Sequence, residues 1–567
     1  MSGSTLSYTS AVSSKPLLGD TIGDLFDTIV ARYPDNEALV VRHQQRDQKP
    51  LRYTYRQLQQ EVNRCARALL ALGVKKGQRV GIWSPNCAEW CITQFATAKI
   101  GAILVNVNPS YRLHELEYAM TQSGCSWLVS ADVFKSSNYT EMLYQLVPGL
   151  AESQPGQLQC ELLPELRGII TLSQETKAGM LRWQDMFSHT DSVSDEALSR
   201  AQAELNFDDP INIQYTSGTT GFPKGATLSH HNILNNGFFV AESMGFTAED
   251  RLVIPVPLYH CFGMVMGNLG CVTHGATMIY SGDGFDPLAV LQTVAEEKAT
   301  ALYGVPTMFI AELNHPEFDQ FDLSTLRTGI MAGSPCPIEV MKKVIERMHM
   351  AGVQIAYGMT ETSPVSLQTG SHDPLEKRVG SVGRTQPHLE NKIIGPDGSL
   401  MPRGEIGELC TRGYSVMLKY WNNPKATEDS IDQAGWMHTG DLAVMDEEGY
   451  VRIVGRSKDM IIRGGENVYP REIEEFLYTH PDVADVQVTG VPDEKYGEEI
   501  IAWIKPAPGH SPSEDDIKGF CQGKIAHFKI PRYIKFVDTF PMTVTGKIQK
   551  FRMREISTEE LGLKSLS

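Results

Sequence analysis

The chain has 567 residues, of which 41% are hydrophobic and 21% charged, the composition of a soluble globular protein. Because one hydrophobic core rarely serves more than about 250–300 residues, this length predicts at least two domains. The formal net charge of −17 argues against general nucleic-acid binding, which needs clustered positive charge. Ten cysteines without a CxxC pair or a Cys/His quartet favour reduced thiols over a disulfide framework or structural zinc.

The ends of the chain give little sign of targeting. No apolar run reaches the roughly 20 residues that a membrane-spanning helix needs. The first twenty residues are rich in Ser and Thr and contain a single base, Lys15, which gives a mitochondrial leader weak support. The last residues, Lys564–Ser567, do not form a peroxisomal signal. We therefore predict a cytoplasmic location, with the mitochondrial matrix left open for a eukaryotic chain.

Strand-like and helix-like runs alternate in the first half of the chain, from about Gly23 to Ala301. Glu61–Leu72 has apolar residues at helical spacing, and Gly73 follows as a natural stop. Arg79–Trp83 and Ile100–Val105 have the pattern of short buried strands. This alternation predicts α/β layers around mostly parallel sheets.

A polyphosphate-binding segment is predicted directly after Ile211–Tyr215, whose apolar residues alternate as in a half-buried strand. Glycines turn backbone N–H groups toward an anion, hydroxyl groups add donors, and a lysine adds positive charge. Gly225 follows that lysine where a Walker A loop has Ser or Thr, so the segment is a different kind of cradle. An ordinary polar surface loop is the weaker alternative. The segment consists of Thr216, Ser217, Gly218, Thr219, Thr220, Gly221, Phe222, Pro223 and Lys224.

The texture of the sequence changes near Leu400. Glycine-rich short strands at Glu405–Gly413 and Gly449–Val454 predict a small β subdomain, and a separate α+β module of about a hundred residues follows Gly455–Asp459. We predict a large domain over residues 1–455, a hinge over 456–460 and a small domain over 461–567. A plain hairpin turn is the alternative for the hinge.

The elements expected in the small module are a helix at Pro470–Thr479, strands at Val483–Val488 and Ile500–Ile504, and a helix at Glu514–Gln522. Eight basic residues against one acid between Lys524 and Arg554 suggest an anionic ligand, with a solvated charged face as the alternative.

Four further sites have residues suited to catalysis or binding, but each is weak evidence when taken alone. In Ala356–Thr362, Tyr357 suits contact with a flat base and Glu361 suits Mg²⁺, although Tyr357 fits core packing equally well. Asp441 ends His438-Thr-Gly-Asp and suits ribose hydroxyl groups, or an ordinary Asp turn. Lys547 follows a glycine turn and can act as a mobile charge, whereas most loop lysines do not. His260 is more often a packed histidine than a catalytic base.

Taken together and in this order, the phosphate loop, YGMTE, HTGD, GRSKD and TGK motifs resemble the adenylate-forming superfamily of acyl-CoA synthetases, adenylation domains and luciferases. The resemblance runs from roughly Leu18 to Arg554. Within it, Arg463–Ile473 and Ile525–Pro531 look like fatty-acyl-CoA ligases. Asp209–Gln214 is similar to medium-chain ligases of the acyl-CoA synthetase family member 2 type.

The resemblance implies an α/β fold: a large N-terminal domain of layered α/β subdomains plus a β subdomain, and a small mobile α+β C-terminal domain. It implies an ATP-dependent fatty-acid–CoA ligase, of the acid–thiol ligase class, that acts through acyl-AMP and releases AMP and pyrophosphate. ATP, Mg²⁺ and coenzyme A are the implied cofactors and co-substrates, with a carboxylic acid as partner and a homodimer left open. An aryl- or branched-chain-acid–CoA ligase and a catalytically inert lipid-binding relative are the alternatives.

The resemblance also assigns residues. Lys547 would bridge the carboxylate and the α-phosphate, Thr216 and Glu361 would hold Mg²⁺, and His260 would line the acyl entrance and assist thioester formation. Lys458 would be the hinge, and Val305, Gly333, Pro306 and Ser334 would line the acyl pocket. The implied CoA-binding residues are Gly464, Gly465 and Glu466. The implied ATP-binding residues are Thr216 to Lys224, Tyr357, Gly358, Met359, Thr360, Glu361, Thr362, Asp441, Arg456 and Lys547.

Overall fold

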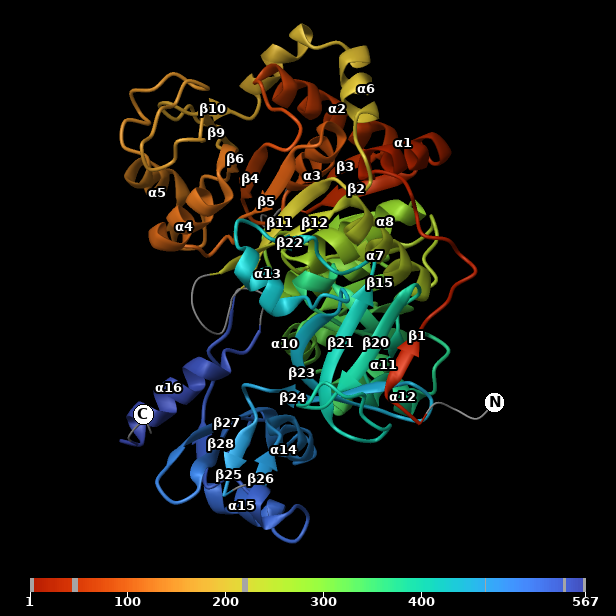
Figure 1. Cartoon of the computed structure of the whole chain (residues 1–567), viewed down its shortest axis with the longest axis vertical. Coiled ribbons are helices and arrows are strands. Elements are labelled where there is room, and N and C mark those ends of the chain that lie inside the picture. The colour runs from red at the N-terminus through yellow and green to blue at the C-terminus, as the bar shows by residue number, and fades with distance from the viewer. Residues whose placement is uncertain (1–4, 43–48, 217–222, 465, 544–546, 564–567) are drawn as a thin grey trace.

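The computed structural model describes residues 5–42, 49–216, 223–464, 466–543 and 547–563. In Figure 1, the chain up to strand β24 (Val451–Arg456) forms a large body, and a smaller body lies below it. The predicted residues Ser217–Phe222 and Gly465 lie outside the described residues.

The first large sheet is parallel over most of its width. Its only antiparallel pairs among the described residues join β12 to the strands on either side of it. The described strands run in the order β10 (Leu181–Arg182), β9 (Gly168–Thr171), β6 (Cys125–Ser130), β4 (Arg79–Trp83), β5 (Ile103–Asn106), β11 (Pro210–Thr216), β12 (Lys224–Ser229) and β22 (Lys419–Tyr420).

The second large sheet is parallel from β17 to β2. Its described strands run in the order β19 (Arg384–Thr385), β18 (Val365–Gln368), β17 (Gly352–Gly358), β16 (Thr328–Ala332), β15 (Ala301–Gly304), β13 (Arg251–Val253), β14 (Thr277–Tyr280), β2 (Glu37–Val41) and β3 (Leu51–Thr54). Because β15, β16 and β17 are parallel neighbours, their carboxyl ends meet at one edge, where ligands bind in sheets of this kind.

Helices cover and separate the two sheets (Figure 1). Helix α2 begins at a capping box between Thr54 and Gln57, and Gly73, at a φ of 83°, lies just beyond its end. The described helices of the large body are α1 (Ile22–Arg32), α2 (Tyr55–Ala71), α3 (Ala88–Ile100), α4 (Leu113–Ser123), α5 (Tyr139–Leu146), α6 (Asp195–Ala203), α7 (His230–Ser243), α8 (Gly270–His274), α9 (Pro287–Glu297), α10 (Pro306–Leu313), α11 (Ile338–Arg347), α12 (Leu375–Gly380) and α13 (Pro424–Ser430).

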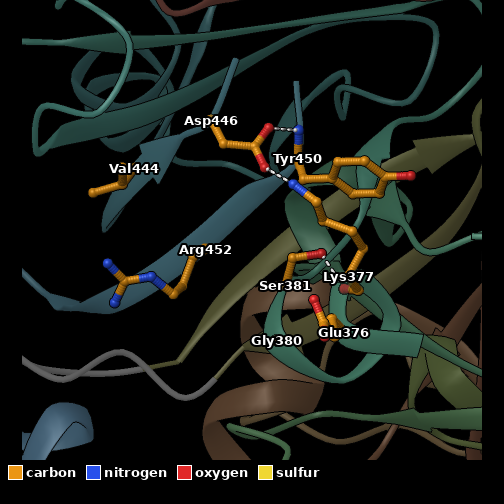
Figure 2. A pocket seen from close by; sticks show the side chains of 8 residues that line it. All are labelled: Glu376, Lys377, Gly380, Ser381, Val444, Asp446, Tyr450 and Arg452. Carbon is orange, nitrogen blue, oxygen red and sulfur yellow. Dashed lines mark hydrogen bonds and ion pairs between the residues drawn. The ribbon is translucent and has the colours of Figure 1, made fainter. Parts of the chain in front are cut away.

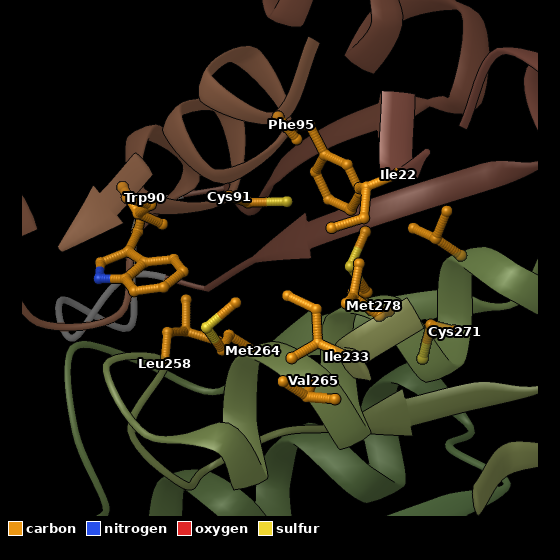
Figure 3. Close-up of a cluster of buried hydrophobic side chains, with 14 of the residues drawn as sticks. Ile22, Trp90, Cys91, Phe95, Ile233, Leu258, Met264, Val265, Cys271 and Met278 are labelled. Carbon is orange, nitrogen blue, oxygen red and sulfur yellow. The ribbon is translucent and has the colours of Figure 1, made fainter. Parts of the chain in front are cut away.

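The main core lies where α3 meets the segment that follows β13. Helix α3 is apolar on nearly every side, so it is buried between layers rather than lying on a surface. Figure 3 shows Trp90 and Phe95 of this helix above Leu258, Met264 and Val265. Met264 and Val265 belong to a π-helical stretch, η2 (Phe262–Leu269), and π-helical turns are frequent near functional sites.

The β subdomain is a sheet of its own. Its described strands run in the order β1 (Tyr8–Ser10), β20 (Leu389–Ile394), β21 (Gly407–Gly413), β23 (Met437–Met445) and β24. The subdomain therefore begins before Leu400, where the change in sequence texture placed it, and it recruits a strand from the N-terminal region.

The small body has an antiparallel core sheet with one parallel edge strand, β29. Helix α14 packs against β24, and the carboxylate of Glu475 accepts a 3.5 Å hydrogen bond from the backbone of Ile338 in the large body. Its described elements are β25 (Ile461–Arg463), β26 (Glu466–Val468), α14 (Pro470–Leu477), β27 (Val483–Asp493), β28 (Gly497–Pro506), α15 (Glu514–Cys521), β29 (Tyr533–Phe536) and α16 (Lys550–Glu560).

The α/β fold class is confirmed, with two local corrections. Ile100 ends helix α3 and the strand begins only at Ile103. Strand β11 is buried on both faces, because Asn212 and Gln214 are 1% and 3% exposed. All ten cysteines are free thiols, and none of the helices in the described ranges is long and apolar enough to cross a bilayer.

Candidate active site

A buried carboxylate lies between the two large sheets' edges. Glu361 follows β17 and is 5% exposed. Its Oε1 accepts hydrogen bonds from the Tyr420 hydroxyl at 2.7 Å and from Thr216 Oγ1 at 3.3 Å. Thr216 ends β11 directly opposite Lys224 on β12, so both ends of the predicted phosphate loop are anchored here. A carboxylate beside a hydroxyl is an oxygen donor set that suits Mg²⁺.

A second cluster joins β17 to the β subdomain. The Tyr357 hydroxyl donates a 2.6 Å hydrogen bond to Asp441 Oδ2, and Arg456 Nε lies 3.1 Å from Asp441 Oδ1. Asp441 and Arg456 face each other across β23 and β24. Burial raises the pKa of Asp441, while the Arg456 guanidinium opposes that rise. The predicted nucleoside residues are thus brought together by the fold.

Strand β23 is irregular just before Asp441, where the sequence suggested a turn, and Glu408 on β21 holds this stretch. One carboxylate oxygen of Glu408 accepts the backbone N–H of Gly440 at 3.1 Å, and the other lies 3.1 Å from His438 Nδ1. Gly440 has a φ of +70°, a conformation that favours glycine. Cys410 Sγ lies 3.7 Å from the same histidine nitrogen. Because both oxygens of Glu408 already have partners, this carboxylate serves to hold the irregular part of β23 before Asp441.

Lys547 reaches this site from the small body. Its Cε lies 4.0 Å from the point where a Cβ on Gly333 would stand. Burial and then repulsion by the Arg456 guanidinium lower the pKa of Lys547, while Glu361 and Asp441 oppose the shift. A lysine from the last part of the chain therefore shares one electrostatic environment with the two carboxylates of the large body.

The charge of the same lysine acts on His260. Burial and the Lys547 cation lower its pKa to about 3, so its imidazole is neutral at pH 7 in this arrangement. Its Nδ1 accepts a 3.2 Å hydrogen bond from the backbone N–H of Phe262.

The residues predicted for the acyl pocket lie at the carboxyl ends of β15 and β16, and Gly333 is the one that approaches Lys547. Val305 precedes α10 at the carboxyl end of β15, and its Cγ1 lies 3.1 Å from the point where a Cβ on Gly333 would stand. Gly333 follows β16 at a φ of +90°. Pro306 begins α10, and Ser334 follows Gly333.

The remaining YGMTE positions shape the backbone around Glu361. A Cβ on Gly358 would meet the Pro364 carbonyl oxygen at 1.7 Å, so only glycine fits. Thr362 Oγ1 contacts the backbone of Met359, and Thr360 and Glu361 form the short 3-10 turn η4 (Thr360–Thr362).

The structure does not bring Gly464 and Glu466 to this site. Gly464 follows β25 and Glu466 begins β26, and both are exposed. Lys458 lies exposed in the turn between β24 and β25, where the chain passes from one body to the other.

Tyr420 contacts the candidate site and was not predicted from the sequence. It holds Glu361 through its hydroxyl, and Lys224 Nζ lies 4.9 Å from its ring centre. Tyr420 comes from a two-residue strand, β22, and no spacing or motif in the sequence links it to the phosphate loop.

Figure 2 shows a different cavity, of about 330 Å³, between α12 and the β subdomain. The Lys377 ammonium lies 2.5 Å from Asp446 and 4.9 Å from the Tyr450 ring centre. This cation is therefore already paired within the protein. None of the residues that line this cavity belongs to the predicted site.

Comparison with known proteins decides the family. Residues 26–421 match the model of the AMP-binding enzyme, and residues 472–547 match that of the AMP-binding enzyme C-terminal domain. The chain belongs to the AMP-binding enzyme family.

Named relatives match over nearly all of this AMP-binding enzyme. It is 52% identical to the putative acyl-CoA synthetase YngI of Bacillus subtilis, over 97% of this chain and 99% of that protein. It is 45% identical to the mitochondrial medium-chain acyl-CoA ligase ACSF2 of Bos taurus, over 96% of this chain and 89% of that protein.

Among solved structures, the anthranilate CoA ligase AuaEII in complex with anthranoyl-AMP is similar, with a TM-score of 0.83 and 28% identity. The match covers 97% of this chain and 99% of that one. Family and relatives together identify the chain as an AMP-forming acid–CoA ligase that uses ATP and CoA.

Proposed function

We propose that this AMP-binding enzyme activates a medium-chain fatty acid and transfers it to CoA in two half-reactions at one site. The observation that carries the proposal is the position of Lys547, a half-buried lysine of the small body. Its Cε lies 4.0 Å from the point where a Cβ on Gly333 would stand, and it feels the charges of Glu361, Asp441 and Arg456 of the large body. The ACSF2 relative acts on medium chains by its name, which supports the same acid class here.

In the first half-reaction, a carboxylate oxygen attacks the α-phosphorus of ATP, and pyrophosphate leaves as the acyl-AMP bond forms. Two anions must approach each other, so fixed positive charge and fixed geometry supply most of the catalysis. Lys547 would lie between the carboxylate and the α-phosphate, and its pKa would rise again once these anions surround it.

The nucleotide would be held by the two clusters of the large body. Tyr357 would lie against the adenine, while Asp441 and Arg456 would hold the ribose. Residues 216–224 would wrap the β- and γ-phosphates. Thr216 and Glu361 would hold Mg²⁺, which when bound neutralises phosphate charge.

In the second half-reaction, the small domain would turn about Lys458. This rotation would withdraw Lys547 and bring Gly464 and Glu466, which are exposed in the present arrangement, to the pantetheine of CoA. The proposal keeps residues 1–455 as the large domain, 456–460 as the hinge and 461–567 as the small domain.

A pyrophosphate-release screen tests the proposed function. Purified enzyme with ATP and Mg²⁺ is given short, medium and long fatty acids, benzoic-type acids and amino acids, each with and without CoA. We expect the highest kcat/KM with fatty acids of medium length, and acyl-CoA only when CoA is present. A preference for aromatic acids would replace the fatty acid by an aryl acid, and no acyl adenylate from any acid would overturn the proposal.

The cytoplasm is the proposed location. Fractionation of cells that express the untagged chain checks this, and recovery in a mitochondrial fraction would contradict it.

A further inference from the structure

A ladder of buried amide side chains runs along strand β11, in the segment Asp209–Gln214. Asn212 and Gln214 are two residues apart, so their side chains lie on the same face of the sheet. Asn106 stands opposite Gln214 on the neighbouring parallel strand β5 and is 1% exposed. Buried amides are costly without hydrogen-bond partners, so the partners of this ladder are informative.

The three amides are bonded to one another. Asn212 Nδ2 donates to Asn106 Oδ1 at 2.9 Å, and Gln214 Nε2 donates to Asn212 Oδ1 at 2.8 Å. Asn106 and Gln214 also reach the sulfur of Met264, at 3.1 and 3.2 Å. Met264, labelled in Figure 3, belongs to the π-helical stretch η2, so the ladder is tied to that segment.

The two ends of the ladder hold the residues on either side of His260. Asn106 Nδ2 donates to the carbonyl oxygen of Tyr259 at 2.8 Å. The Cys261 thiol donates to Gln214 Oε1 at 2.9 Å. Burial raises the pKa of Cys261 to about 12, so this thiol keeps the proton that it donates. His260 is therefore fixed on both sides by the same ladder.

The hydrogen bond of His260 itself selects one tautomer. Its Nδ1 accepts from the backbone N–H of Phe262 at 3.2 Å. A neutral imidazole carries one N–H, so the proton must be on Nε2. Since the pKa of His260 is lowered to about 3, the ring stays neutral at pH 7. The side chain thus offers the site a hydrogen-bond donor and no free base.

The position of His260 assigns this donor to the second half-reaction. His260 belongs to the large body, whereas Lys547 belongs to the small one. When the small domain withdraws Lys547, His260 stays beside the acid site. The acyl carbonyl then develops negative charge as the thiolate attacks, and a fixed donor stabilises such an oxyanion strongly in a site that excludes water.

We propose that Gln214, Asn212 and Asn106 are positioning residues that hold His260 as a neutral Nε2–H donor to the acyl carbonyl during thioester formation. This inference rests on the proposed acyl-AMP pathway. The thiol releases its proton to solvent, the thiolate sulfur bonds to the carbonyl carbon, and the C–O bond to AMP breaks as AMP leaves with the electron pair. His260 keeps its proton throughout.

The tautomer is measured by NMR on enzyme labelled with ¹⁵N- and ¹³C-histidine. We expect one histidine, assigned by its absence in His260→Gln, to show a neutral Nε2–H ring from pH 5.5 to 8. A protonated ring at pH 7, or a proton on Nδ1, would overturn the inference whatever the substrate proves to be.

Single-turnover rates from preformed acyl-AMP and CoA test the role. Glutamine keeps an N–H donor and leucine has none, so His260→Gln should retain the rate within about fivefold while His260→Leu loses about 100-fold. Both variants must keep the wild-type melting temperature within a few degrees. An equal loss in both would rule out the donor role, and a wild-type acid limb between pH 5.5 and 8 that His260→Gln removes would show that His260 acts as a base.

The ladder is tested with Gln214→Met, which keeps the volume but removes the amide. We expect the thioester rate to fall about tenfold, the KM for ATP to stay unchanged, and the His260 resonances to show mixed tautomers. The matched control is Gln354→Met, a buried amide on β17 that bonds to Gln368 and Ser243. Unchanged tautomer and rate in Gln214→Met would overturn the positioning role.

Failure of this inference is distinguishable from failure of the proposed function. If no acid is adenylated, the pathway is wrong, and the tautomer measurement still reports on the ladder. If acids are adenylated and His260→Leu transfers them at the wild-type rate, the pathway stands and the donor role is wrong.

Discussion

The large-domain half of the site and the small-domain half are built differently. In the large domain, Glu361 is held by Tyr420 and Thr216, and Asp441 by Tyr357 and Arg456, all from the same body. In the small domain, Lys547 is hydrogen-bonded through its backbone to Thr543, and Gly464 and Glu466 lie exposed elsewhere.

This difference suggests that the large domain binds the nucleotide and that the small domain switches between the two half-reactions. Groups that recognise the nucleotide bind it more tightly when they are already fixed, because their side-chain entropy is lost on folding rather than on binding. Groups that serve only one half-reaction must be able to leave, and a position on the separate small body would allow this. Each prediction below perturbs one side of this comparison.

The largest effect is expected for Lys547→Ala. Loss of the cation should lower the rate of carboxylate-dependent pyrophosphate release by about 10²–10³-fold, or about 2.7–4 kcal/mol, by analogy with a lost oxyanion donor. Thioester formation from supplied acyl-AMP should be spared. Lys535→Ala, another lysine of the small domain, is the control, and an equal loss in both half-reactions would reject the switching role.

A smaller loss is expected for Lys458→Pro. Proline fixes φ near −65° and restricts the rotation of the turn, so thioester formation should fall about 50-fold, or about 2.3 kcal/mol of barrier, with adenylation largely intact. Lys458→Ala removes the side chain without stiffening the backbone and should stay close to wild type in both assays. Wild-type thioester output from the proline variant would refute the hinge.

On the fixed side, Asp441→Asn should raise the KM for ATP about tenfold. Hydrogen bonds to charged groups contribute about 1.5–3 kcal/mol. The substitution weakens the two that Asp441 makes, with Tyr357 and with Arg456. The rate of thioester formation from acyl-AMP should change less. Asp397→Asn, an exposed turn residue, is the control. An unchanged KM for ATP would remove Asp441 from the nucleotide site.

The smallest effect concerns pH. Because burial and Arg456 lower the pKa of Lys547, the protonated form is lost as pH rises at a lower pH than for an ordinary lysine. The rate of adenylation below saturating ATP should therefore decline on the alkaline side, and Lys547→Arg, which stays charged, should show a weaker decline. Identical alkaline limbs in the two enzymes would contradict the assignment.

The sequence predicted the members of the site better than their supports. Tyr357, Glu361, Asp441 and Lys547 belong to motifs whose order indicates a family, and the structure brings them together. Tyr420 was not predicted, because a two-residue strand produces no periodic signal.

The burial of β11 was predicted wrongly for a related reason. Asn212 and Gln214 alternate with isoleucine as solvent-facing residues do, and only the partners supplied by distant segments reveal that they are interior. The small-domain boundaries and the roles of Gly464 and Glu466 remain predictions, since they concern an arrangement other than the one described.

The contact among Val305, Gly333 and Lys547 has a consequence for how such an enzyme diversifies. A side chain at position 333 would press on Val305 at 3.1 Å and approach the lysine at 4.0 Å, on a backbone with φ of +90°. A substitution at position 333 would therefore alter both the turnover rate and the choice of acid. Val305 is proposed to border the acid, so new substrates would be acquired by changes at position 305 while glycine is kept at position 333.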